Sequence, residues 1–257
     1  MTARPRLAVF KFASCDGCQL QLLNLERELL VLADRIEIAH FPEATSRSLP
    51  GPFDLALVEG SIATPEDAER IREVRRQARR LVTIGACATA GGIQWLRALA
   101  PLEASAAAVY PHPEWLAVLP RSSPISEHVR VDCELHGCPV SREQLLRTLL
   151  RELLGTEPDL PGHSVCIECK RRGAVCVAVA RGVPCLGPAT RAGCGALCPA
   201  LGRGCYGCFG PAADARAETL ARSLLDRGEA PDRVRLLFSG ITGQEEPFRR
   251  AAESVDG

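Results

Sequence analysis

Cysteine is the residue type whose number and spacing could do chemistry in this chain. The chain has 257 residues, and 13 of them are cysteine. An odd count and frequent Cys-x-x-Cys pairs argue against a framework of disulfide bonds. Such a pair closes a tight loop, which suits two ligands of one metal ion or cluster. The pattern therefore predicts metal or redox chemistry.

Eight of the cysteines are crowded into residues 162–211 and form two complete sets of four thiols. They are Cys166, Cys169, Cys176, Cys185, Cys194, Cys198, Cys205 and Cys208. Four thiolates satisfy a [4Fe-4S] cubane, and they equally satisfy a structural zinc ion. Neighbouring glycines and prolines let the backbone approach closely and aim amides at sulfur, which favours iron–sulfur clusters. A zinc-stabilised interaction module stays open as the alternative at this point.

Four more cysteines lie just beyond the ends of predicted strands. Alternating apolar segments predict strands at residues 6–12, 35–40, 54–58, 81–85 and 129–132. The cysteines that follow them are Cys15, Cys18, Cys87 and Cys138. Because the carboxyl ends of parallel strands meet at one edge of a sheet, we expect these four sulfur atoms to converge.

Helical patterns alternate with these strands. They are expected at residues 19–33, 65–80 and 142–154. Thr64-Pro65-Glu66-Asp67 is a strong helix start, and Ser141 with Gln144 forms a capping box. The alternation predicts an α/β fold with a flavodoxin-like, doubly wound parallel sheet.

The composition changes after Gly155 and predicts three parts. Residues 1–155 form the flavodoxin-like domain with the first group of cysteines. Residues 156–212 form a small, irregular, cysteine-rich iron–sulfur domain that depends on bound metal for its stability. Residues 213–257 form a C-terminal helical tail with helices near 215–226 and 244–253.

Charge and hydropathy exclude several classes of protein. Lys+Arg and Asp+Glu are both 31, so the chain lacks the basic excess of a nucleic-acid binder. No run of 18 apolar residues predicts a membrane-spanning helix. Residues 1–13 contain neither a secretory apolar core nor a twin-arginine pair, which predicts a cytoplasmic location. No Gly-x-Gly-x-x-Gly follows the first strand, so we expect no nucleotide on this sheet.

Several motifs together resemble the small subunit of [NiFe] hydrogenases. The motifs are FASCDGCQ at 12–19, VEGS at 58–61, GACATAGG at 85–92 and GCP at 137–139. The later segments GPATRAGCGALCP at 187–199 and CYGCFGP at 205–211 are similar to the cytosolic, NADP-linked bidirectional group, whose sulfhydrogenases contain a delta subunit of this type. A weaker resemblance extends to the 20 kDa subunit of respiratory complex I, which has adjacent cysteines in place of Cys15-x2-Cys18.

The resemblance implies three [4Fe-4S] clusters as the cofactors. The proximal cluster would be bound by Cys15, Cys18, Cys87 and Cys138. The distal cluster would be bound by Cys166, Cys169, Cys176 and Cys185. The medial cluster would be bound by Cys194, Cys198, Cys205 and Cys208. The division of the last eight follows the order of ligands in other small subunits.

The resemblance also implies an oxidoreductase complex acting on hydrogen. The nickel–iron centre would lie on a separate large subunit, so no residue of this chain is expected to be catalytic. This chain would relay electrons between that centre and partner subunits of two kinds, flavin/NAD(P)-binding and ferredoxin-like iron–sulfur. An iron–sulfur subunit of another oxidoreductase complex is the alternative within electron transfer.

Three residues near the expected ligands have other predicted roles. Cys133, the thirteenth cysteine, is expected to be a buried residue that binds no metal. Glu59 follows a buried strand and is expected to order the backbone near the proximal group, with proton transfer as the alternative. Gln19 stands where many uptake hydrogenases have glutamate, so this chain lacks that proton route.

Overall fold

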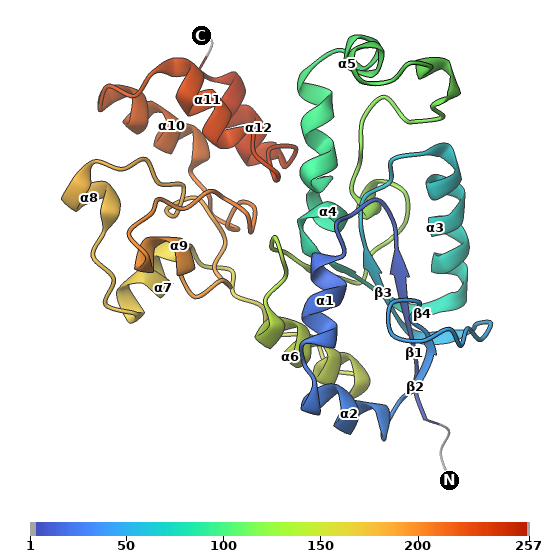
Figure 1. The fold of residues 1–257 in the computed structure, drawn as a ribbon. Helices are drawn as coiled ribbons and strands as arrows, with labels where there is room; N and C mark the ends of the chain where they lie inside the picture. Colours follow the sequence, from blue (N-terminus) through green and yellow to red (C-terminus); the bar gives the residue numbers. More distant parts are fainter. Residues whose placement is uncertain (1–3, 256–257) are drawn as a thin grey trace. The chain divides into compact units, whose positions relative to one another are not determined.

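The computed structural model describes residues 4–255, which divide into two compact units (Figure 1). The first unit ends at Asp159 and the second begins at Leu160. The composition changes at Gly155, and the boundary between the two units lies four residues later. Each unit has its own hydrophobic core.

The first unit is built on a parallel sheet in the order β2-β1-β3-β4-β5. Its strands are β1 (Arg6–Lys11), β2 (Glu37–His40), β3 (Phe53–Glu59), β4 (Ala78–Ile84) and β5 (Cys133–Leu135). This order is that of flavodoxin-like sheets, and it confirms the predicted doubly wound α/β fold.

Helices cover both faces of this sheet. The unit contains α1 (Gly17–Leu23), α2 (Arg27–Ala33), α3 (Pro65–Gln77), α4 (Gly85–Ala90), α5 (Leu102–Val109) and α6 (Arg142–Leu153), with short 3-10 helices η1 (Gly92–Leu99), η2 (Pro113–Trp115) and η3 (Ile125–Glu127). In Figure 1, α1 and α6 lie on one side of the strands and α3 lies on the other. Because both faces are covered, residues Leu55–Val58 of β3 are all buried and apolar.

The predicted start of α3 is confirmed. The Thr64 hydroxyl accepts a hydrogen bond from the Asp67 N–H, and the Asp67 carboxylate accepts one from the Thr64 N–H, both at 3.1 Å. Pro65 occupies the first turn, where its missing N–H costs nothing.

Several predicted elements were wrong in extent. The helix expected at 65–80 ends at Gln77, and the strand expected at 81–85 already begins at Ala78. The single helix expected at 19–33 is broken between α1 and α2, where Glu26 has a φ of 43° and Leu25 turns inward to be buried. The last strand begins at Cys133 rather than 129, because the carboxylate of Asp132 accepts the Leu81 N–H at 2.8 Å and so takes the place of a ladder partner.

The second unit consists of short helices joined by irregular loops. They are α7 (Val165–Arg171), α8 (Val177–Arg181), α9 (Leu197–Ala200), α10 (Ala217–Asp226), α11 (Pro231–Phe238) and α12 (Glu246–Glu253). Side chains of α10, α11 and α12 pack with Leu186 and Ala189 in one apolar cluster. The residues predicted as a C-terminal helical tail therefore share a core with part of the cysteine-rich segment.

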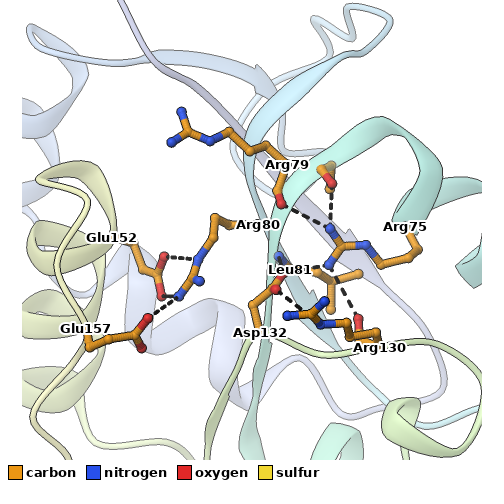
Figure 2. Close-up of polar contacts among 9 residues, drawn as sticks. Arg75, Arg79, Arg80, Leu81, Arg130, Asp132, Glu152 and Glu157 are labelled. Carbon is orange, nitrogen blue, oxygen red and sulfur yellow. Dashed lines mark hydrogen bonds and ion pairs between the residues drawn. The ribbon is translucent and has the colours of Figure 1, made fainter.

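Polar contacts tie β4 to α6 and to the segment before β5 in the first unit (Figure 2). The Asp132 carboxylate accepts from the Arg75 guanidinium at 2.6 Å as well as from the Leu81 N–H. Arg80 makes two 2.8 Å hydrogen bonds to Glu152, whose side chain is 3% exposed. Burial raises the pKa of the Asp132 carboxyl, but the Arg75 ion pair and the hydrogen bonds outweigh it and hold that pKa below its ordinary value.

We expect Asp132→Asn to lower the free energy of unfolding by about 2 kcal/mol at pH 7, because it weakens two charge-assisted hydrogen bonds of a buried group. Since the folded pKa is depressed, this stabilisation is present above the unfolded pKa of about 4 and is lost as the pH falls through the folded value. Urea unfolding at pH 7 and below pH ~4 measures both effects. Asp159→Asn, at an exposed position, is the control, and an equal loss in both variants would contradict the assignment.

Candidate functional site

The loops that follow four of the parallel strands meet at one edge of the sheet. After β1 and β3, the Phe12 N–H donates to the Glu59 carbonyl at 2.8 Å. After β4 and β5, the Ala86 N–H donates to the Gly137 carbonyl at 2.7 Å. Of the four cysteines predicted as the proximal group, Cys15 and Cys138 lie in loops after β1 and β5, and Cys18 and Cys87 lie in the first turns of α1 and α4, which follow β1 and β4. The strand ends thus position them as the topology predicts.

Glycines leave room for the sulfur atoms at this edge. A Cβ atom added to Gly85 would lie 2.1 Å from the Cys18 Sγ, and one added to Gly92 would lie 2.4 Å from the Cys87 Sγ. Both distances are far below van der Waals contact, so any side chain there would displace a thiol. Gly85 also has a φ of +85°, which glycine adopts without strain.

The buried carboxylate of Glu59 orders the backbone of the first Cys-x-x-Cys loop. It accepts hydrogen bonds from the N–H groups of Cys18 at 3.0 Å and Gln19 at 3.2 Å. Burial raises the pKa of Glu59, while these two hydrogen bonds oppose that effect. The predicted ordering role of Glu59 agrees with this geometry.

A surface ion pair holds the other end of the same loop. Lys11, the last residue of β1, donates to the Asp16 carboxylate at 2.6 Å. Asp16 itself has a φ of 67°, a left-handed conformation that aspartate tolerates better than most residues. Lys11 was not among the residues singled out in the sequence. The feature of the sequence that could have indicated Lys11 is its position, five residues before an acidic residue inside a Cys-x-x-Cys loop.

The four thiols at this edge are close enough to act on one another electrostatically. Burial raises the pKa of Cys18, and the charges of Glu59, Cys87 and Cys138 raise it further. Burial likewise raises the pKa of Cys87 to about 11, with Cys138 and Cys15 among the charges that add to it. The four thiols of the predicted proximal group therefore lie in one electrostatic neighbourhood at this edge of the sheet.

Backbone groups also act on two of these sulfur atoms. The backbone of Val140 lowers the pKa of Cys18 and that of Ile93 lowers the pKa of Cys87, each against the larger effect of burial. Both effects favour the thiolate form, which is the form that binds metal. Hydrogen bonds from backbone N–H groups to sulfur are among the contacts that tune iron–sulfur clusters.

Cys133 lies apart from this group. Burial raises its pKa to about 12, and the charges that act on it belong to Glu152, Arg80, Glu157 and Glu134 rather than to another thiol. Its location on β5, beside the Arg80–Glu152 ion pair, fits the expectation that it binds no metal.

The second unit gathers its eight cysteines around short helices and glycine-containing loops. A Cβ atom added to Gly187 would lie 3.3 Å from the Cys185 Sγ and 3.7 Å from the Cys166 Sγ, so both sulfur atoms flank this glycine. The Cys205 N–H donates to the Cys185 Sγ at 3.2 Å. Cys185 thus touches members of both predicted sets.

Neighbouring thiols again raise one another's pKa. Burial and the charges of Cys166, Cys185, Cys176 and Cys194 raise the pKa of Cys169 to about 11. The pKa of Cys205 is raised to about 12 by burial, with Cys185 and Cys208 contributing. Burial raises the pKa of Cys194 most, and the charges of Glu168 and of the thiol Cys198 raise it further. The interactions join cysteines within each predicted set and also across the two sets, as between Cys205 and Cys185 and between Cys169 and Cys194, so the division into distal and medial ligands stays a prediction.

Glu168 joins the two halves of this cysteine-rich segment. It lies between the two cysteines of α7, and its carboxylate accepts the N–H groups of Gly193 at 2.9 Å and Ala196 at 3.1 Å. These two residues flank Cys194. We did not single out Glu168 in the sequence. Its signal was that it is the one acidic residue between positions 160 and 212.

The thiols differ in their access to solvent. Cys176 is exposed at the start of α8, whereas Cys205 is buried and Cys198 and Cys208 are intermediate. Across residues 4–255, no group of three or more histidine, cysteine, aspartate or glutamate side chains is arranged to hold a single metal ion. In the same range, no helix is both long and apolar enough to cross a membrane.

The first unit has an α/β fold with four thiols at the edge of its sheet, and the second unit is rich in cysteine. This combination is typical of one class of redox subunit. The NADH ubiquinone oxidoreductase 20 kDa subunit family matches residues 15–151 of this chain. The Sulfhydrogenase 2 subunit delta of Pyrococcus furiosus is 38% identical over 212 residues, which cover 81% of this chain and 87% of that protein. A subunit of the F420-non-reducing hydrogenase of Methanocaldococcus jannaschii is 32% identical, over 92% of this chain and 94% of that protein.

Solved structures show the same likeness. One chain of an NAD+-reducing [NiFe]-hydrogenase in the H2-reduced state has a TM-score of 0.56 and 33% identity, covering 62% of this chain and 96% of that chain. The present chain belongs to the NADH ubiquinone oxidoreductase 20 kDa subunit family, as a subunit of the [NiFe] hydrogenase type.

We expect Gly85→Ala to deplete iron from the sheet-edge cysteines, because the added methyl group would overlap the Cys18 sulfur. Gly155→Ala is the matched control, since Gly155 also has a positive φ, of +68°, but nothing within 4 Å of an added Cβ. Iron and acid-labile sulfide per chain after anaerobic purification measure the effect. Equal iron content in the two variants would show that the close approach to Cys18 is unimportant.

Proposed function

We propose that this chain is the electron-transfer subunit of a cytoplasmic [NiFe] hydrogenase and carries three [4Fe-4S] clusters. The observation that carries the proposal is the convergence of four thiols, from positions far apart in the sequence, at the edge of the sheet in the first unit. The proximal cluster would be bound by Cys15, Cys18, Cys87 and Cys138.

The second unit would hold the other two clusters. The distal cluster would be bound by Cys166, Cys169, Cys176 and Cys185, and the medial cluster by Cys194, Cys198, Cys205 and Cys208. The neighbourhood of Cys166, Cys185 and Cys205 around Gly187 supports clusters held by this segment, and the division between the two sets rests on the order of ligands in other small subunits.

The residues present fit such clusters. Glycines leave space against the sulfur atoms, a backbone N–H donates to the sulfur of Cys185, and backbone groups lower the pKa values of Cys18 and Cys87. The clusters would supply one-electron transfer at low potential. The protein's own groups would exclude water, fix the loops through Glu59 and Glu168, and direct amide dipoles at sulfur.

The partner subunits of this chain are inferred from the complexes to which its relatives belong. The matched relatives are subunits of hydrogenases, and one similar structure is an NAD+-reducing enzyme. We infer a large subunit that holds the nickel–iron centre, and flavin/NAD(P)-binding and ferredoxin-like iron–sulfur subunits that exchange electrons with this chain. The hydrogen-activating chemistry would therefore take place on the large subunit.

Metal and acid-labile sulfide analysis of the anaerobically purified protein, with whatever co-purifies, tests this function. Three cubanes predict about twelve iron atoms and as many sulfides per chain, with nickel in a co-purifying chain. Zinc without sulfide would contradict electron transfer and leave a zinc-stabilised interaction module. Clusters without a nickel-containing partner would indicate an iron–sulfur subunit of another oxidoreductase.

We expect Cys138→Ala to abolish hydrogen-linked dye reduction in the assembled enzyme, because it removes a proximal ligand, while the clusters of the second unit remain. Iron content would fall by about four per chain. Cys133→Ser is the matched control and should change neither iron content nor dye reduction. Full activity in Cys138→Ala, or loss of a cluster in Cys133→Ser, would overturn the ligand assignment.

A further inference from the structure

Cys15 lies in a stretch of chain that neither a strand nor a helix holds in place. The strand β1 ends at Lys11 and the helix α1 begins at Gly17, so residues 12–16 only connect them. Cys15 is also exposed, which means that burial does not fix its thiol either. Contacts from other parts of the first unit must therefore set the position of this predicted ligand.

One contact to this stretch is the ion pair of Lys11 with Asp16. The two side chains are 42% and 30% exposed. Ion pairs that are open to water to this degree are screened and contribute little to a fixed geometry. The ion pair by itself is therefore a weak anchor for Cys15.

A buried pair of serines supplies a firmer anchor. The Ser122 hydroxyl donates to the Ser61 hydroxyl at 2.6 Å, and the Ser61 hydroxyl donates to the Ala13 carbonyl at 3.3 Å. Both serines are fully buried, so water does not compete for these bonds. Each hydroxyl in such a chain polarises the next one. The chain of hydrogen bonds ends on Ala13, two residues before Cys15.

Backbone hydrogen bonds brace both serines. The Ser61 N–H donates to the Ala13 carbonyl at 2.9 Å, and the Ala13 N–H donates to the Ser61 carbonyl at 3.2 Å. Next to Ser122, the Ser123 N–H donates to the Ile62 carbonyl at 3.0 Å, and the Ile62 N–H donates to the Ser123 carbonyl at 2.9 Å. Three segments that are distant in the sequence are thus joined beyond the parallel strands, and one of them continues into Cys15.

Gly60 makes the close approach of two of these segments possible. A Cβ atom added to Gly60 would lie 2.5 Å from the backbone carbonyl carbon of Phe12, and Gly60 has a φ of +97°. Only glycine adopts this conformation at such a distance without strain. The Ser61 hydroxyl is therefore held directly against the backbone that precedes Cys15.

We propose that Ser61 and Ser122 are positioning residues for the sheet-edge cluster and set the direction in which Cys15 presents its sulfur. They act through the Ala13 carbonyl and do not bind iron themselves. The role differs from that of Glu59, which fixes the other end of the same Cys-x-x-Cys loop through the N–H groups of Cys18 and Gln19. This inference rests on the proposed function, because it concerns a ligand of the proposed proximal cluster.

Ser61→Ala, Ser122→Ala and the double variant, each in the cluster-loaded, full-length chain, test the proposal. The matched control Thr148→Val removes a buried hydroxyl of the same unit that has no hydrogen-bond partner within residues 4–255. Deuterium uptake by the peptide 12–18, the EPR spectrum of the reduced chain and the iron content are measured under anaerobic conditions. The signal that is missing in Cys138→Ala identifies the sheet-edge cluster.

We expect Ser61→Ala to raise deuterium uptake by this peptide about fivefold, because the loss of one buried hydrogen bond makes local opening easier. The EPR signal of the sheet-edge cluster should change its shape, while the signals of the second unit stay the same. Ser122→Ala should have a smaller effect, since Ser61 keeps its bond to Ala13. The double variant should match Ser61→Ala, because Ser122 acts through Ser61.

Unchanged uptake in Ser61→Ala would overturn the proposal. Faster uptake with an unchanged EPR signal would also overturn it, because the serines would then stabilise the loop without positioning Cys15. An equal response in Thr148→Val would contradict it as well. If Ser61→Ala does not fold, Ser122→Ala carries the same comparison. Failure of the proposed function is distinguishable, since it would be seen in the unmodified chain as absence of iron and sulfide, whereas this inference fails only in the variants.

Discussion

The parallel order of the sheet is the constraint on which the candidate site depends. Since all five strands run in one direction, the loops after β1, β3, β4 and β5 leave the sheet at the same edge. Hydrogen bonds between these loops then fix their spacing. Because of this arrangement the pair Cys15 and Cys18 lies at the same edge as Cys87 and Cys138, which are distant in the sequence, and Gly85 and Gly92 keep side chains away from the sulfurs of Cys18 and Cys87.

Irregular loops that carry cysteines need hydrogen-bond partners that no helix or strand provides, and a carboxylate supplies them in both units. Glu59 accepts two N–H groups at the first Cys-x-x-Cys loop. Glu168 accepts two around Cys194. In each case one side chain satisfies amides that would otherwise be unpaired, and it fixes the direction in which a thiol is presented. The two units share this solution although their folds differ.

The sequence predicted the fold class and the convergence of the first four cysteines, because strand alternation and strand ends are local patterns. It did not predict the break between α1 and α2, since leucine spacing continues through residues that turn in order to bury Leu25. It placed the last strand too early, because a side-chain contact of Asp132 replaces the ladder there. The packing of α10 to α12 on Leu186 was also invisible, since it depends on contacts distant in sequence.

The arginines of the chain divide into two physical roles that composition alone conceals. Arg75 faces the carboxylate of Asp132 and Arg80 faces that of Glu152, and these ion pairs act within the first unit. Within residues 4–255, the guanidinium groups of Arg172 and Arg181 donate only to backbone carbonyls. These hydrogen bonds orient the two side chains but leave their charges without a carboxylate partner in that range. A cation that is fixed in direction but not paired contributes little to its own fold. Its field extends into the solvent instead.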